Sequence, residues 1–217
     1  AASLRRTAPR KGGLTGMKKI IRDTLILTAI TLISGLALAT VYQITKQPIA
    51  QAEAAAELAA YEGVFPEATF ETLAPASFDP VAAGVADGEG VTVEAVAAAR
   101  RDGQTVGYAL KVTSPNGYGG NITVAVGVAT DGSLTGISVI SQSETAGLGA
   151  KCAAADFADQ FRGITGGTVV FTKTGKSAPN EIDALSGATI TTRAVTAAVN
   201  TGLAYARDHL LEGGTTV

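Results

Sequence analysis

The sequence predicts an α+β protein: one N-terminal transmembrane helix followed by an antiparallel-sheet domain with flanking helices. Three observations indicate this class. They are an uncharged apolar run over residues 24–45, a series of Val- and Ile-rich segments separated by turn residues over 91–141, and an apolar-periodic segment over 192–211. Strands grouped before helices, rather than alternating with them, are typical of α+β domains.

Charge is distributed unevenly along the chain. Of its 217 residues 46% are hydrophobic, enough for one domain of ordinary size plus an appended segment. Residues 1–22 contain seven basic residues and no acidic one, whereas the remainder carries 10 basic and 19 acidic residues. A basic arm can bind nucleic acid, but this arm adjoins the apolar run, which favours a role in membrane topology. We therefore expect a membrane and no nucleic acid among the partners.

The apolar run over residues 24–45 is predicted to be a membrane anchor. Its 22 uncharged residues, at about 1.5 Å each in a helix, can span a hydrocarbon core of about 30 Å. A secretory signal peptide is the alternative, because residues 37–39 read Ala-Leu-Ala, like a cleavage site. The run is longer than the usual signal-peptide core of about 7–15 residues, which favours a retained anchor.

The positive-inside rule predicts the topology of this anchor. Residues 1–23 are expected to form a basic cytoplasmic arm, and the acidic remainder to lie outside the cytoplasm. The protein would then cross the inner (cytoplasmic) membrane of the cell once. Met17 followed by two lysines resembles a natural start, so whether residues 1–16 are native stays open.

Two regions follow the anchor. Residues 46–63 are rich in Ala and Glu, with apolar side chains near helical spacing, and predict a helical stalk that Phe65 and Pro66 end. Residues 64–217 are expected to form the extracytoplasmic domain. Its early part, residues 73–90, is rich in Pro and Gly and predicts a loop.

The domain is predicted to contain an antiparallel meander followed by helices. Segments with a period of two, or with a continuous apolar run, are separated by turns rich in Asp, Asn, Gly and Pro. The expected elements are strands over 91–99, 105–113, 121–129 and 133–141, a short helix over 151–161, a strand over 168–172 and a closing helix over 192–211.

Several kinds of chemistry have no support in the sequence. With one Cys and one His, the chain cannot build a Cys/His zinc or iron–sulfur site of its own, and a Ser–His–Asp triad would need His209 as its base. We interpret His209 as a surface residue and Cys152 as a buried small residue rather than a reactive thiol. The sequence contains no P-loop and no strand–GxGxxG–helix unit, so we predict no catalytic residue and no metal ligand.

The strongest candidate site is the stretch over residues 183–195, where a Gly-containing turn runs into the closing helix. Gly187 and Ala188 allow a ligand to approach the backbone closely, and Thr189 stands where the turn enters the helix, followed by two more threonines. Such a helix start favours an anion, phosphate above all. The alternative is an ordinary Ser/Thr helix cap.

Three motifs give this stretch a family resemblance. Residues 183–189, Asp-Ala-Leu-Ser-Gly-Ala-Thr, resemble the Asp-x-x-(Ser/Thr)-Gly-Ala-Thr signature of FMN-binding domains that carry the flavin covalently. Residues 116–122, Asn-Gly-Tyr-Gly-Gly-Asn-Ile, precede a strand as in that family. Residues 143–149, Ser-Glu-Thr-Ala-Gly-Leu-Gly, are similar to its Glu-Thr-Pro-Gly-Leu-Gly loop, with Ala146 in place of Pro. In this order after one membrane span, the motifs most resemble the G subunits of Rnf complexes and, more distantly, the C subunits of sodium-pumping NADH:quinone reductases.

The resemblance implies a covalent cofactor. In that family the last Thr of the signature, here Thr189, is joined to the FMN phosphate as a phosphoester by a separate flavin transferase that recognises the Asp-containing signature. Residues 143–149 would lie against the isoalloxazine, although a plain strand-to-helix turn is an alternative for them, and Tyr118 could instead pack on the sheet. The implied FMN-binding residues are Thr189, Ser186, Gly187, Ala188, Asp183, Glu144, Thr145, Gly147, Leu148, Gly149 and Tyr118.

The resemblance also implies a function. The chain is expected to be an electron-transfer subunit of an Rnf-type ion-translocating ferredoxin:NAD oxidoreductase, with other flavin and iron–sulfur subunits of a membrane complex as its partners. Ferredoxin and NAD would bind those other subunits, since this sequence has a motif for neither. The alternatives are the C subunit of a sodium-pumping NADH:quinone reductase and a membrane-anchored module that senses or binds a flavin.

Overall fold

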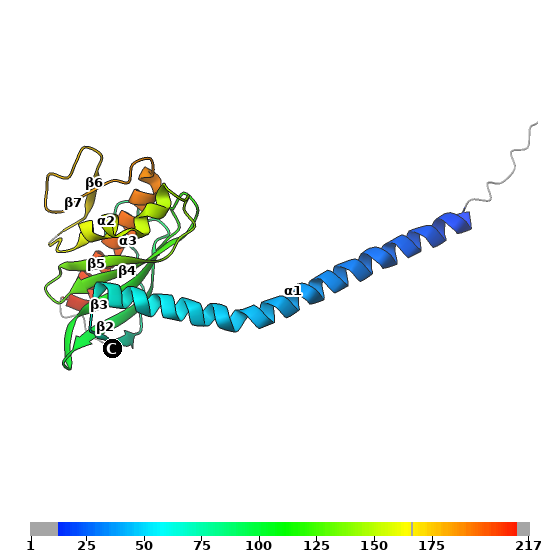
Figure 1. The fold of residues 1–217 in the computed structure, drawn as a ribbon, viewed down its shortest axis with the longest axis horizontal. Coiled ribbons are helices and arrows are strands. Elements are labelled where there is room, and N and C mark those ends of the chain that lie inside the picture. The colour runs from blue at the N-terminus through cyan, green and yellow to red at the C-terminus, as the bar shows by residue number, and fades with distance from the viewer. Residues whose placement is uncertain (1–12, 166, 212–217) are drawn as a thin grey trace, which may run out of the picture. The chain divides into compact units, whose positions relative to one another are not determined.

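The structure is a computed structural model that describes residues 13–165 and 167–211 (Figure 1). The chain divides into two compact units, Ala1–Glu53 and Ala54–Val217. Most of the expected cytoplasmic arm lies outside the described residues, including its basic residues Arg5, Arg6, Arg10 and Lys11.

Helix α1 (Gly13–Val64) contains the expected anchor and the expected stalk in one continuous helix. From Met17 it is long and apolar enough to cross a membrane. Pro48 lies inside α1 and does not end it, so the anchor and the stalk are not separate helices. The second compact unit begins at Ala54, so the last turns of the expected stalk belong to the domain.

The threonine hydroxyl groups within the apolar run form hydrogen bonds inside the helix. Each threonine of the run donates a hydrogen bond to the carbonyl oxygen four residues earlier, over 2.8–3.1 Å. Such internal bonds suit a helix in hydrocarbon, where no water is present to accept them. The threonines are Thr24, Thr28, Thr31, Thr40 and Thr45.

The second unit is built on a five-stranded antiparallel sheet in the order β1-β2-β3-β4-β5. This arrangement confirms the predicted meander, and the two residues Asp102 and Gly103, both with positive φ, make the tight turn between β2 and β3. Strand β1 was not predicted. The strands are β1 (Thr69–Leu73), β2 (Thr92–Arg101), β3 (Gln104–Ser114), β4 (Ile122–Ala129) and β5 (Leu134–Ser141).

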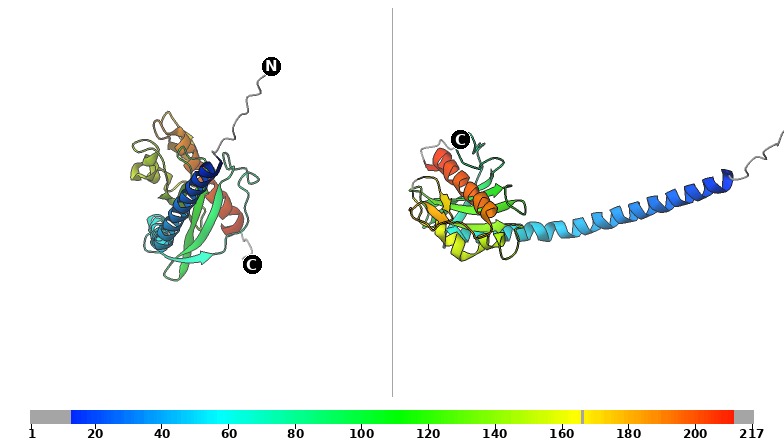
Figure 2. Two further views of the ribbon diagram at one scale, coloured as in Figure 1. Left: turned by 90° about the vertical axis from the view of Figure 1, so that its right-hand side faces the viewer. Right: turned by 90° about the horizontal axis from the view of Figure 1, so that it is seen from above.

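Helices cover both faces of this sheet. Alternation along the strands sends Val and Leu side chains to one face, where they pack with helix α3 (Thr189–Ala206). Figure 2 shows α3 lying against the sheet. The other face carries alanines, and there the end of α1 packs through Tyr61, Val64 and Phe65. The small alanine side chains leave room for a helix to lie close to the sheet.

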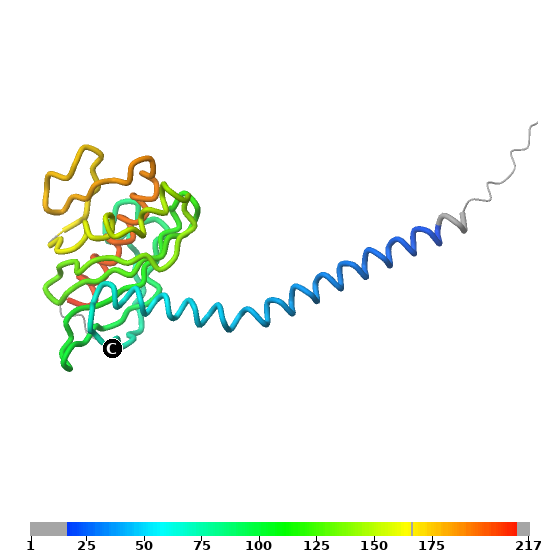
Figure 3. The backbone as a smooth tube through the Cα atoms, viewed as in Figure 1, coloured from blue at the N-terminus to red at the C-terminus, as the bar shows by residue number. Residues whose placement is uncertain are grey.

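The segment between β5 and α3 is more irregular than the sequence predicted. The expected helix over 151–161 is three short pieces, the 3₁₀ turns η1 (Gly149–Ala153) and η2 (Asp159–Phe161) and the single α-helical turn α2 (Ala155–Ala158). The expected strand appears as β6 (Val170–Thr172). It pairs in parallel with an unpredicted strand, β7 (Glu181–Asp183), and the chain between them can be followed in Figure 3.

The C-terminal end of the described chain also differs from expectation. Helix α3 begins at Thr189, three residues earlier than predicted, and passes into a π-helical turn, η3 (Arg207–Leu211). His209 is half-buried, not a surface residue: its ring lies 4.8 Å from that of Tyr205 and 5.8 Å from that of Phe78. The interpretation of His209 as a surface residue was therefore wrong, because this aromatic cluster brings together segments far apart in the sequence.

Candidate functional site

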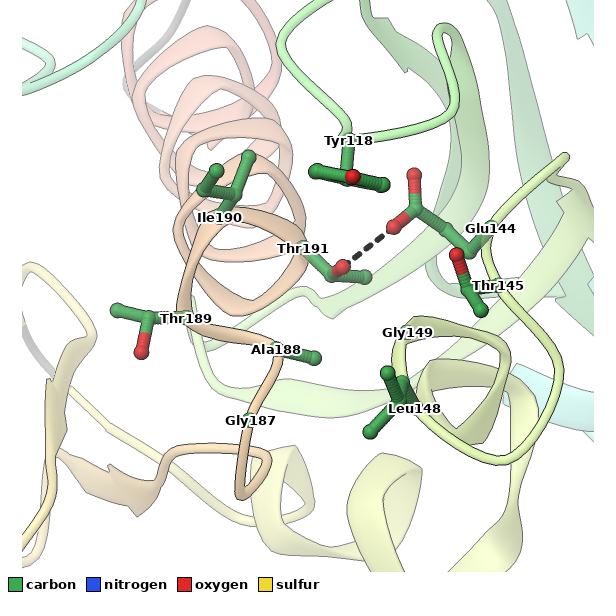
Figure 4. Close-up of a pocket in the computed structure, with 10 residues that line it drawn as sticks. All are labelled: Tyr118, Glu144, Thr145, Leu148, Gly149, Gly187, Ala188, Thr189, Ile190 and Thr191. Atoms are coloured by element: carbon green, nitrogen blue, oxygen red, sulfur yellow. Dashed lines mark hydrogen bonds between the residues drawn. The ribbon is translucent and has the colours of Figure 1, made fainter.

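A pocket of about 540 Å³ lies where three loops meet the start of α3 (Figure 4). One loop joins β3 to β4, a second follows β5, and the third is the turn that enters α3. These are the three stretches that carry the sequence motifs. The lining residues are Tyr118, Glu144, Thr145, Leu148, Gly149, Gly187, Ala188, Thr189, Ile190 and Thr191.

The turn into α3 exposes the positive end of the helix. The Ala188 amide donates to the Leu185 carbonyl over 3.0 Å, and Gly187 adopts φ +73°, a conformation that favours glycine. Ala188 is the N-cap residue, and its side chain caps nothing. The first helical bond runs from the Thr192 amide to the Ala188 carbonyl, so the amides of residues 189–191 donate to none of the described residues. Free amides at a helix start attract an anion.

The three threonines of this helix start have different hydroxyl partners. Thr191 is buried and donates to Glu144 Oε2. Thr192 is buried, donates to the Ala188 carbonyl and accepts from the Leu185 amide, both over 3.0 Å. Thr189 is half-buried, and its hydroxyl forms no hydrogen bond with any residue that the structure describes. Its side chain points to the side of the helix start opposite Glu144 (Figure 4).

Glu144 joins the segments that form the side of the pocket opposite the Thr189 side chain. Its side chain is almost completely buried, with Oε1 accepting from the Gly119 amide over 2.8 Å and Oε2 accepting from Thr191. The loop after β5, the loop before β4 and helix α3 therefore meet at one carboxylate. A Cβ atom at Gly149 would lie 2.4 Å from Glu144 Oε2, so this wall requires a glycine.

Large apolar side chains are left open around the pocket. Tyr118 is 71% exposed, Leu148 46% and Ile190 51%. An aromatic ring system placed between them would cover surface that is otherwise in contact with water. The pocket thus combines apolar walls with an anion-attracting helix start.

The structure brings most of the expected site residues together and leaves three aside. Ser186 is exposed in the turn that enters α3, and Gly147 is exposed in the loop after β5. Asp183 ends β7, where its backbone amide donates to Gln160 Oε1 over 2.6 Å and its side chain is exposed. These three do not line the pocket.

Two lining residues were missing from the predicted set. Ile190 is a large apolar side chain next to Thr189 in the first turn of a helix, which is a local signal in the sequence. Thr191 lines the pocket through its bond to Glu144, which lies 47 residues away in sequence, and nothing local indicates that bond. Arg193 is exposed and pairs with Asp87 over 3.6 Å, outside the lining. Cys152 is buried as expected, and burial, followed by the charge of Glu144, raises the pKa of its thiol to about 11.

Two family models match the chain. One, described as the RnfG N-terminal region, matches residues 14–64, and the other, described as an FMN-binding domain, matches residues 117–204. The second match contains every residue that lines the pocket.

Curated relatives agree with these models. The chain is 34% identical over 186 residues to the G subunit of the Na⁺-translocating ferredoxin:NAD⁺ oxidoreductase complex of Acetobacterium woodii, covering 84% of this chain and 89% of the relative. It is 28% identical to the G subunit of the ion-translocating oxidoreductase complex of Methanosarcina acetivorans, covering 88% and 97%. Identity to the G subunit of the proton-translocating ferredoxin:NAD⁺ oxidoreductase complex of Clostridium ljungdahlii is 38%, over 47% of this chain and 54% of the relative.

Among solved structures, the C subunit of the Na⁺-translocating NADH-quinone reductase from Parabacteroides distasonis superimposes with a TM-score of 0.48 at 26% identity, covering 56% of this chain and 64% of that one. Membership of a family is shown by the sequence relatives, above all by the Acetobacterium protein, which is matched over most of its length. The chain belongs to the family of G subunits of ion-translocating ferredoxin:NAD⁺ oxidoreductase complexes, and its residues 117–204 match an FMN-binding domain.

Proposed function

We propose that Thr189 Oγ1 is joined to the FMN phosphate as a phosphoester, and that the chain transfers electrons within an Rnf-type membrane complex. One observation carries the attachment site. Of the three threonines at the start of α3, only Thr189 has a hydroxyl without a hydrogen bond to the described residues, and it adjoins the free amides of that helix start.

The helix start suits the phosphate of such an ester. A phosphodiester keeps one negative charge, which free amides and the helix dipole stabilise. None of the ten lining residues is Lys or Arg, so backbone groups supply the positive end of the pocket. Thr191 and Thr192 are less suited to attachment, because their hydroxyls already bond within the protein.

The apolar walls suit the isoalloxazine. The pocket volume lies within the range of about 300–1,000 Å³ that cofactor sites occupy. Tyr118, Leu148 and Ile190 offer apolar surface on different sides of it (Figure 4). When bound, FMN supplies one- and two-electron chemistry, and this chain supplies the attachment, the orientation and an apolar surface that shields part of the cofactor from water.

The partners follow from the family. The relatives are named as subunits of ferredoxin:NAD⁺ oxidoreductase complexes, and we infer that ferredoxin and NAD bind other subunits, with electrons passing between this FMN and flavin or iron–sulfur centres there. A flavin transferase would install the cofactor. Asp183 and Ser186, exposed and outside the pocket lining, are available to such an enzyme.

The charge pattern supports a topology with the N-terminus in the cytoplasm and the FMN domain outside it. Lys18, Lys19 and Arg22 precede the apolar run, and acidic residues predominate after it. A reporter fused to the C-terminus tests this orientation: alkaline phosphatase should be active and green fluorescent protein dark. The reverse pattern would place the domain in the cytoplasm.

Flavin fluorescence in a denaturing gel tests the attachment. The full chain coexpressed with a flavin transferase should give a fluorescent band, and Thr189→Val should lose essentially all of it. Ser186→Ala, which changes a neighbouring exposed hydroxyl, should lose less. A dark wild-type band, or a fluorescent Thr189→Val band, would overturn the proposal, and peptide mass mapping would show whether Thr191 or Thr192 is modified instead.

A further inference from the structure

The pocket contains a single ionisable carboxylate. Of the ten lining residues only Glu144 carries a charge, and its side chain is only 8% exposed. We propose that the negative charge of Glu144 holds down the reduction potential of a flavin in this pocket. The inference rests on the proposed function, since it requires FMN at this site.

The hydrogen-bond donors to the Glu144 carboxylate are uncharged. Its two oxygens accept from the Gly119 amide and the Thr191 hydroxyl, and within residues 13–165 and 167–211 no Lys, Arg or His forms an ion pair with it. Hydrogen bonds from neutral donors stabilise a carboxylate but leave its net charge in place. The field of that charge therefore reaches the pocket.

The charge is not needed for the hydrogen bonds. A glutamine at position 144 could accept from Gly119 through its oxygen and donate to the Thr191 oxygen through its nitrogen, because a hydroxyl both donates and accepts. An amide also costs less free energy to bury than a carboxylate. A residue that only joined the three loops would not require ionisation, so a role that depends on charge is the better explanation.

The charge of Glu144 also acts on a buried thiol outside the pocket lining. Cys152, which is completely buried, has a raised thiol pKa whose causes are burial first and the charge of Glu144 second. Glu144 thus disfavours formation of another negative charge close to it. Electrons added to a ligand in the pocket meet the same opposition wherever protons do not fully compensate them.

A redox titration of the full chain tests this role. Wild type, Glu144→Gln and Asp156→Asn are purified in detergent after coexpression with a flavin transferase, and FMN is reduced by dithionite beside a reference dye. Dithionite is oxidised to sulfite, its two electrons pass to FMN, and protons come from the buffer. Asp156 is an exposed carboxylate of α2 outside the pocket lining, so it controls for net charge.

We expect Glu144→Gln to raise the equilibrium constant for reduction at least tenfold, which is about 30 mV for a two-electron couple. Asp156→Asn should stay close to wild type. An unchanged potential in Glu144→Gln, or an equal shift in both variants, would overturn the proposal. A purely structural role for Glu144 would alter the amount of flavin loaded without moving the potential.

A second variant covers the case in which Glu144→Gln does not load flavin. Thr145 is exposed and lines the pocket beside Glu144, so Thr145→Lys adds a cation without removing a hydrogen bond of the carboxylate. Thr145→Lys should raise the reduction potential of FMN, as Glu144→Gln should. An unchanged or lower potential would overturn the proposal. Failure of the proposed function itself would look different, because the wild-type chain would then carry no flavin to titrate.

Discussion

The carboxylates under the end of α1 and the carboxylate at the pocket have different partners. On the face covered by the end of α1, Lys111 Nζ lies 3.0 Å from Glu57 Oε2 and 3.6 Å from Glu94 Oε2, so a cation compensates both acids. At the pocket, Glu144 is more deeply buried, and among the described residues its side chain has only neutral donors. The carboxylates of Glu57 and Glu94, which lie where α1 packs on the sheet, are paired with a cation. The carboxylate of Glu144, which has no such cation, lies at the candidate functional site.

The largest effect should come from filling the wall around Glu144. Gly149→Ala would place a Cβ atom 2.4 Å from Glu144 Oε2 and 2.5 Å from Thr191 Oγ1. We expect most flavin loading to be lost and the free energy of unfolding to fall by about 1–3 kcal/mol, because the wall must move. In-gel fluorescence and urea denaturation measure the two effects.

The matched control for that change is Gly63→Ala on the other face. A Cβ atom there would lie 3.5 Å from Ser138 Oγ, an ordinary contact, and alanine favours a helix. Stability should rise slightly or stay the same, with normal loading. Normal loading in Gly149→Ala would show that the Glu144 wall is not part of the flavin site.

The next effect should come from removing the compensating cation. Lys111→Met leaves Glu57 and Glu94 close together without a counter-charge in a partly buried place. We expect a loss of about 1–2 kcal/mol in the free energy of unfolding, measured with urea, while flavin loading is unchanged. If Glu144→Gln destabilised the protein more than Lys111→Met, the contrast between the paired carboxylates and Glu144 would be wrong.

Lys111 also gives a pH dependence with a defined sign. Burial lowers its pKa, but hydrogen bonding and charge from Glu57 and Glu94 outweigh burial, so the pKa lies above the ordinary 10.5. A raised pKa in the folded state stabilises the protein below the unfolded pKa, and this contribution is lost as pH rises through the folded pKa. The stability difference between wild type and Lys111→Met should therefore be constant near neutral pH and shrink above about pH 10.5.

A smaller effect is expected at the hydroxyl partner of Glu144. Thr191→Val removes one hydrogen bond to a charged acceptor and should cost about 1.5 kcal/mol in the free energy of unfolding. The control is Thr196→Val, because Thr196 is buried in the same helix and donates only to the Thr192 carbonyl, over 2.8 Å. Equal losses of unfolding free energy in urea titrations of the two variants would mean that the hydrogen bond from Thr191 to the carboxylate is no stronger than an ordinary bond to a carbonyl.

The smallest effect should come from the exposed ion pair beside α3. Arg193→Gln breaks a 3.6 Å contact between half-exposed side chains and should change the free energy of unfolding by less than about 0.5 kcal/mol. Flavin loading should also persist. Loss of loading would show that the helix-start amides need the charge of Arg193 to hold the phosphate.

The elements predicted well from the sequence are those with a strong local signal. Strands β2 to β5 alternate or run apolar between clear turns, and the apolar run of α1 is equally plain. Strand β1 was missed because its five residues, Thr69–Leu73, are short and have no clear apolar alternation. The helix over 151–161 failed because Ala154 is extended and interrupts it.

The site was predictable in its motifs but not in its contacts. Thr189 follows from the signature in the sequence, and the pocket gathers the three motif loops around it. The bonds that join those loops link Glu144 to Gly119, 25 residues away, and to Thr191, 47 residues away. Which hydroxyl each threonine leaves open depends on those distant partners, so local propensity could not distinguish Thr189 from its neighbours.

Helix α3 is a rigid attachment point for the proposed cofactor. Thr189 is its first residue, and beyond the first turn nearly all of the helix is buried against the sheet, down to the aromatic cluster at Tyr205. A group bonded there would move with the body of the domain rather than swing on a loose arm. Amide hydrogen exchange along residues 194–206 should then be among the slowest in the protein, and electron hops would occur over distances fixed by docking of the whole domain.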